Sequence, residues 1–190
     1  IVVAVDPAGT ANKRSDETGI VVVGWTGKKA IVLADYTDRY SPNGWGSKAW
    51  WAHEKWSADA IVAEKNYGGD MVKHVLETES HERARIILVT SRRGKQLRAE
   101  PIVAQYEREK VLHLRASQAE DSYGGLAKLE EEMLSWVPGE GASPNRVDAL
   151  VHGLTDLVKS HAPMTLATPS QVLGNRPAAS TVPGRHRRAM

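Results

Sequence analysis

The chain has 190 residues, enough for about one domain with a buried core, and its lack of cysteine excludes disulfides and thiolate metal sites. No apolar run approaches the roughly 20 residues that a transmembrane helix needs. Four of the 25 basic residues and no acid lie in residues 161–190, which leaves 21 basic against 23 acidic side chains before them. A body with a net charge of −2 does not attract nucleic acid through its overall field, so DNA binding would require a local basic patch and metal ions.

The first part of the sequence predicts three strands in an antiparallel meander. They cover residues 1–6, 19–25 and 30–36, with a polar loop over 7–18 and a turn over 26–29. Their continuous apolar character indicates burial on both faces. Because the chain begins at Ile1, inside the first predicted strand and without Met or a signal peptide, we expect a domain of a longer polypeptide.

Helices and strands alternate in the rest of the body. The predicted helices cover 46–56, 67–78, 95–108, 126–136 and 145–159, and the predicted strands cover 60–64, 86–89 and a short edge strand at 111–114. This order predicts an α/β fold with a mixed central sheet flanked by helices, spanning residues 1–160. Residues 161–190 are rich in Pro, Ala, Ser, Thr and Arg, which predicts a flexible basic tail.

Helical periodicity predicts the side chains that face the core. Those of the last four helices are Met71, Val72, Val75 and Leu76, then Leu97, Ile102, Val103 and Tyr106, then Leu126, Leu129, Met133 and Leu134, and finally Val147, Leu150, Val151, Leu154 and Val158. We expect Trp50, Trp51 and Trp56 to pack beneath the first helix, and stacking on bases is the alternative.

Three acids stand where predicted apolar elements end or begin. Asp6 ends the strand over 1–6, Glu64 ends the strand over 60–64, and Asp148 lies in the first turn of the last helix. Pro7 ends the strand after Asp6, and Gly68 and Gly69 after Glu64 allow close approach of a ligand. Each acid taken alone could be a turn or cap residue. Their joint occurrence is the argument for a shared site.

Carboxylates that converge at one edge of the core repel one another unless a cation lies between them. Carboxylate and water oxygens suit Mg²⁺ or Mn²⁺. Two such ions about 3.5–4 Å apart can orient an attacking water and stabilise the leaving oxygen of a phosphodiester. Asp6, Glu64 and Asp148 are therefore our candidate ligands for two divalent ions.

Neighbouring residues are secondary candidates. Arg92, Arg93, Lys95 and Arg98 form the densest basic cluster of the body and could hold DNA phosphates, although a solvated loop is the alternative. His152 follows Asp148 by one helical turn and could lie at the edge of the site, as could Asn66 in the turn after Glu64.

The sequence resembles the C-terminal nuclease domain of tailed-bacteriophage terminase large subunits, which has a ribonuclease H-like fold. The motifs that carry the resemblance are Val3-Ala-Val-Asp6-Pro7, Ser15-Asp16-Glu-Thr18-Gly19-Ile20, Val62-Ala-Glu64-Lys-Asn66-Tyr-Gly68-Gly69, Lys95-Gln-Leu-Arg98-Ala99-Glu-Pro101-Ile102 with Tyr106-Glu107, and Asn145-Arg146-Val-Asp148-Ala149-Leu150. Any one of them is weak, and five in the family's order are fairly specific.

The resemblance implies an endonuclease that cuts concatemeric double-stranded viral DNA with two Mg²⁺ or Mn²⁺ ions. By position Asp6, Glu64 and Asp148 would be the metal-binding acids. Asp16 would be a further acid or would position water, and a loop carboxylate ahead of the second strand is the alternative for it. The resemblance also implies three protein partners, which are the N-terminal terminase ATPase domain, the terminase small subunit and the capsid portal, in the cytoplasm of an infected bacterium at the procapsid. No Gly-x-x-x-x-Gly-Lys-Ser/Thr phosphate loop occurs, so we do not expect ATP hydrolysis.

Two alternatives stay open at this stage. The first is a Holliday-junction resolvase or transposase-type nuclease with the same fold. The second is a non-catalytic module that docks on DNA or on the portal and whose acids are structural.

Overall fold

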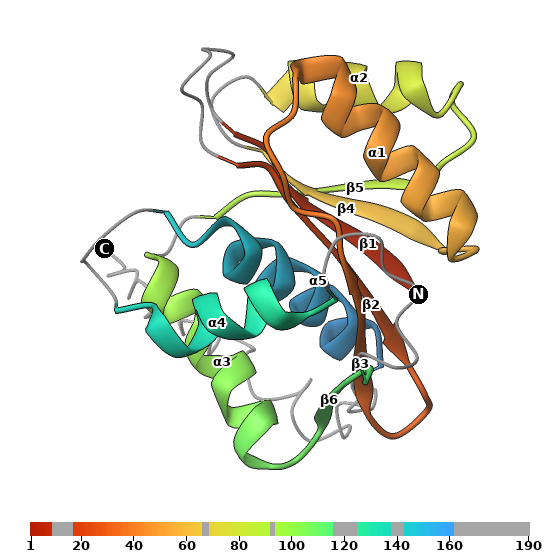
Figure 1. The fold of residues 1–190 in the computed structure, drawn as a ribbon. Helices are drawn as coiled ribbons and strands as arrows, with labels where there is room; N and C mark the ends of the chain where they lie inside the picture. Colours follow the sequence, from red (N-terminus) through yellow and green to blue (C-terminus); the bar gives the residue numbers. More distant parts are fainter. Residues whose placement is uncertain (9–16, 66–68, 92–93, 116–124, 138–142, 162–190) are drawn as a thin grey trace, which may run out of the picture.

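A mixed six-stranded sheet with helices on both faces forms the centre of the computed structural model (Figure 1). The structure describes residues 1–8, 17–65, 69–91, 94–115, 125–137 and 143–161. The strands within these residues are β1 (Val2–Asp6), β2 (Gly19–Trp25), β3 (Ala30–Asp35), β4 (Ala60–Glu64), β5 (Ile86–Val89) and β6 (Val111–His113). The helices are α1 (Pro42–Lys55), α2 (Gly69–Glu79), α3 (Lys95–Glu107), α4 (Ala127–Ser135) and α5 (Asn145–His161).

The sheet has the strand order β5-β4-β1-β2-β3-β6. Strands β1, β2 and β3 pair antiparallel, β4 runs parallel to β1, β5 runs parallel to β4, and β6 runs parallel to β3 at the opposite edge. The predicted meander, the mixed sheet and the edge position of β6 are therefore confirmed. Since β1 and β4 are parallel neighbours, the acids that end them lie side by side at the carboxyl ends of these two central strands.

Two apolar clusters fill the two sides of the sheet. Figure 1 shows α1 and α2 on one face and α5 with α3 and α4 on the other. All residues of β1 are buried, and so are all of β2 except Trp25, as expected for strands covered on both faces. Helix α5 packs especially close, because a β-carbon at Gly153 would lie 2.8 Å from Val23 Cγ2.

Some predicted core positions are wrong. Met71, Leu97, Val103 and Leu134 are 48%, 53%, 51% and 89% exposed. In each helix the neighbouring apolar residues, such as Leu76, Ile102 and Leu129, supply the buried face instead.

The first helix also differs from its prediction. It begins at Pro42 rather than residue 46, because Ser41 caps it by accepting a hydrogen bond from the Gly44 N–H and proline is favoured at the first helical position. This extra turn brings Trp45 into the core at 3% exposure. Trp51 is 41% exposed beneath the Lys48 ammonium, so core packing is wrong for that tryptophan.

In the part of the chain that the structure covers, no helix combines the length and the apolar character needed to cross a bilayer. The predicted tail over 161–190 lies almost entirely outside the described residues, as do Asp16, Asn66, Arg92 and Arg93.

Candidate metal centre

Asp6 and Glu64 lie at the carboxyl ends of the neighbouring parallel strands β1 and β4. They are 7% and 5% exposed. The chain leaves β1 at Pro7, and the Ala8 N–H then donates to Thr18 Oγ1 at 3.3 Å, which ties the turn after Asp6 to the start of β2. Both carboxylates are thus fixed at the end of the apolar sheet, as the sequence predicts.

Helix α5 brings Asp148 and His152 to the same edge of the sheet. Asp148 lies in its first turn, with its N–H donating to the Pro144 carbonyl at 2.8 Å, and is 5% exposed. His152 follows one turn later, is 6% exposed, and places Nε2 3.2 Å from Glu64 Oε2. The side chain predicted at the edge of the site therefore reaches one of the central acids.

Asp6, Glu64 and His152 can each offer a ligand atom, and the three atoms lie within 4.8 Å of one another. Among the described residues this is the one group of three or more acids or histidines with such spacing. Carboxylate oxygens suit Mg²⁺ and Mn²⁺, and an imidazole nitrogen is tolerated by transition metals such as Mn²⁺. The donor set therefore fits a divalent cation.

The electrostatics of Asp6 also favour a cation. Burial raises the pKa of the Asp6 carboxyl well above its usual range, and the charges of Asp148 and Glu64 raise this pKa further. The Lys95 ammonium opposes the shift but does not cancel it. A divalent ion beside Asp6 would favour its ionised form and relieve the repulsion among the acids.

The Glu64 carboxyl has the opposite shift. Burial would raise its pKa, but hydrogen bonds from His152 and Ser91 and the nearby charges of His152 and Arg98 hold the pKa of Glu64 well below its usual range. The site therefore pairs an acid that is ionised readily with one that resists ionisation.

Two cations of the predicted basic cluster contact these acids. Lys95 Nζ lies 2.5 Å from Asp148 Oδ2 and also donates to Ser143 Oγ. Arg98 Nη1 lies 3.0 Å from Glu64 Oε1, and Nη2 lies 3.3 Å from Asp148 Oδ1. Positive charge at a helix N-terminus is unfavourable, and the acids offset it at the start of α3. Binding of DNA by these residues stays a prediction.

A second charged cluster, which no sequence pattern indicates, is centred on Arg146, two residues before Asp148. This guanidinium is 6% exposed, lies 3.0 Å from Asp35 Oδ2, and also pairs with Glu17 and Glu132. The Glu132 carboxylate in turn accepts the Val147 N–H of α5 at 3.0 Å. The cluster ties the first turn of α5 to β3 and α4, and so fixes the position of Asp148 in that turn.

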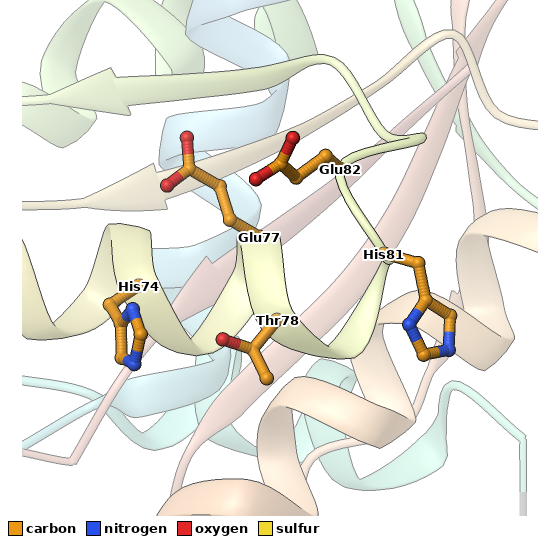
Figure 2. Close-up of a pocket in the computed structure, with 5 residues that line it drawn as sticks. All are labelled: His74, Glu77, Thr78, His81 and Glu82. Carbon is orange, nitrogen blue, oxygen red and sulfur yellow. The ribbon is translucent and has the colours of Figure 1, made fainter.

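A hollow lies elsewhere, at the C-terminal end of α2 (Figure 2). It is lined by His74, Glu77, Thr78, His81 and Glu82. Figure 2 shows that the carboxylates of Glu77 and Glu82 point away from the two imidazole rings, so this group does not converge on one ion.

The family model of the terminase RNase H-like domain matches residues 3–157. The chain belongs to this family. The predicted family and fold of this terminase RNase H-like domain are thus confirmed, and the family match favours them over the resolvase and docking alternatives. No curated protein sequence matches the domain significantly.

A solved structure of a terminase nuclease domain has the same fold as this domain. It is 13% identical to the human cytomegalovirus terminase nuclease domain soaked with manganese, with a TM-score of 0.58 over 85% of each chain. A mutant nuclease domain of the large terminase subunit of bacterial virus Sf6, with manganese, is 15% identical with a TM-score of 0.45 and covers 79% of this chain and 85% of its own. RuvC of Thermus thermophilus is 14% identical, with a TM-score of 0.44 over 86% of this chain and 96% of its own.

Proposed function

We propose that this terminase domain is a metal-dependent endonuclease that cleaves concatemeric double-stranded DNA during viral DNA packaging. The observation that carries the proposal is the buried convergence of Asp6, Glu64 and His152 within 4.8 Å, with Asp148 coupled electrostatically to Asp6. Membership in the terminase family supports a phosphodiester of DNA as the substrate.

Asp6, Glu64 and Asp148 would hold two Mg²⁺ or Mn²⁺ ions. His152 would either bind one of these ions or orient the Glu64 carboxylate that it contacts. Ions bound there would lower the pKa of the attacking water and stabilise charge on the leaving oxygen. The chain's own contribution is to hold the ligands in place: β1 and β4 fix Asp6 and Glu64, and the Arg146 cluster fixes the start of α5. Near-complete burial of the four side chains restricts access of bulk water.

Family membership also supports the partners that we propose. These are double-stranded DNA, the ATPase domain and the small subunit of the terminase, and the capsid portal, with the protein acting in the host cytoplasm at the procapsid.

Nicking of a supercoiled plasmid in the presence of Mn²⁺ tests the proposal, because only an endonuclease converts a closed circle to open and linear forms. We expect Asp6→Asn and Asp148→Asn to reduce cleavage by about 10²–10³-fold, the scale of losing an electrostatic contribution to the transition state. Asp156→Asn, a half-buried acid on the same helix α5, is the matched control and should cleave at the wild-type rate. Equal cleavage by wild type and Asp6→Asn, at matched purity, would exclude this site.

A further inference from the structure

Arg98 occupies a position among the candidate metal ligands that an exposed DNA-binding residue would not take. Its side chain is 15% exposed. One guanidinium nitrogen contacts Glu64 and Ser91 and lies 3.3 Å from His152 Nε2, and the other lies 3.3 Å from Asp148. A single cation therefore bridges two of the three acids and also lies beside the histidine.

The charges of the site set how many ions it can hold. Asp6, Glu64 and Asp148 carry three negative charges when ionised, and Lys95 and Arg98 already contribute two positive charges in contact with them. On the Asp6 side of the site, Asp6, Glu64 and His152 can each offer a ligand atom, and this is where a first divalent ion would bind. A second ion that uses Asp148 together with Glu64 would have to share these carboxylates with Arg98.

The guanidinium is held by charge rather than by a complete set of hydrogen bonds. Among the described residues, its Nε is buried and has no hydrogen-bond partner. Burying an N–H without a partner is unfavourable, so this position of Arg98 is stabilised mainly by its contacts with Glu64 and Asp148. A divalent ion bound to those oxygens would replace the contacts that stabilise Arg98 in this position.

We propose that Arg98 is an internal counter-ion that competes with the second divalent ion, so that the site takes its first ion tightly and its second only when Arg98 leaves Glu64 and Asp148. This inference rests on the proposed two-ion function of the same site. It assigns Arg98 a role in metal stoichiometry, and it explains why a cation is built into a site that needs cations from solution. The nuclease would then require a higher metal concentration for cutting than for its first binding step.

The test is a Mn²⁺ titration of the 190-residue chain without DNA, with free Mn²⁺ followed by electron paramagnetic resonance. Wild type should bind one ion tightly and a second at least about tenfold more weakly, and Arg98→Gln should strengthen the second step by about tenfold or more. Arg108→Gln, which removes an exposed cation at the end of the same helix, should titrate like wild type. Identical second-step affinities in wild type and Arg98→Gln would overturn the inference. Binding of no ion by either protein would instead overturn the proposed metal site itself.

A measurement on the wild-type chain covers the case in which Arg98→Gln does not fold. The ¹⁵N side-chain signal of Arg98 is followed by NMR during a Mg²⁺ titration. It should stay near its starting position through the first binding step and shift during the second. A signal that does not move up to saturation, or that moves only in the first step, would overturn the competition.

Discussion

The backbone carbonyl of Asn145 lies against Gly19, so close that a β-carbon on Gly19 would overlap it and would come within 2.8 Å of the carbonyl carbon. Gly19 is also the partner of Asp6 in the β1–β2 ladder. One glycine thus brings the start of α5, and with it Asp148, next to the strand end that carries Asp6. The geometry of the site depends on the smallest side chain at this position.

Gly19→Ala should therefore separate α5 from β2 and damage the site. We expect a loss of stability of about 1–3 kcal/mol from overpacking and a fall in cleavage rate of about 10²-fold, the effect of misplacing a catalytic group by about 1 Å. Urea unfolding and plasmid nicking measure the two effects. Gly24→Ala is the control in the same strand, because its β-carbon would meet only side chains, at 3.3 Å. Equal behaviour of the two variants would contradict this reading.

Arg146→Met should destabilise the fold strongly. Breaking a buried ion pair by removing one partner costs about 3–5 kcal/mol, because the remaining charge stays buried. Of the three acids that would lose Arg146, Asp35 is the most deeply buried, at 7% exposure. Chemical denaturation provides the measurement, and Arg108→Met, at an exposed position, should change stability by no more than about 0.5 kcal/mol. A loss below about 1 kcal/mol would show that the cluster does not clamp α5.

Leu129 and Leu134 form a matched pair in α4 for testing which face is buried. Leu129 is fully buried and Leu134 is 89% exposed. Leu129→Ala should cost about 2–5 kcal/mol through lost contacts and a cavity, whereas Leu134→Ala should change stability by no more than about 0.5 kcal/mol. Thermal or urea unfolding of the two variants decides the matter, and comparable losses would mean that α4 is rotated from the orientation described.

The pH dependence of the free energy of unfolding should show that ionisation of Asp6 is unfavourable in the folded protein. Because its pKa is raised in the folded protein, the protonated form favours folding, and this contribution is lost as pH rises through the raised value. Above the ordinary range of an aspartate, wild type therefore loses a contribution to stability that Asp6→Asn, which has no ionisable group at this position, keeps. The variant should therefore be more stable than wild type at pH 8, with the difference shrinking towards about pH 4, the ordinary range of an aspartate.

Urea unfolding at both pH values, in buffer with EDTA, measures this difference. A wild-type protein as stable as Asp6→Asn at pH 8 would contradict the raised pKa. Mn²⁺ should reverse the order, because a ligand at 100 times its Kd stabilises the folded state by about 2.7 kcal/mol and Asp6→Asn lacks a ligand for it.

Much of the fold could be predicted from local patterns. The β-branched runs around Val3 and Val22 define buried strands, and the turn residues after Asp6 and Glu64 define where the strands end. The Ser41-Pro42 pair is a local signal for the start of α1 that the expected boundary at residue 46 overlooked. Core faces were harder to predict, because the apolar residues of α3 and α4 extend around more than one side. Only tertiary packing decides between Leu97 and Ile102.

The sequence singles out the three acids as candidates because each stands at a visible boundary, but it does not indicate their cationic partners. Arg98 is 34 and 50 residues from Glu64 and Asp148. The local pattern therefore presents it as part of a basic patch. Arg146 looks like an ordinary charged residue of a helix start, and its burial follows from Asp35 and Glu132, which come from distant elements. Pairing over such distances has no signature in a single sequence.

The most direct test of the account is a crystal structure of the chain soaked in Mn²⁺, with the ions located by anomalous scattering. We predict manganese bound by Asp6 and Glu64 at the ends of β1 and β4, with a second ion next to Asp148 at high Mn²⁺ concentration. Manganese found only elsewhere, for example between His74 of α2 and His81 after the end of this helix, with Asp6 and Glu64 not coordinated, would contradict the account.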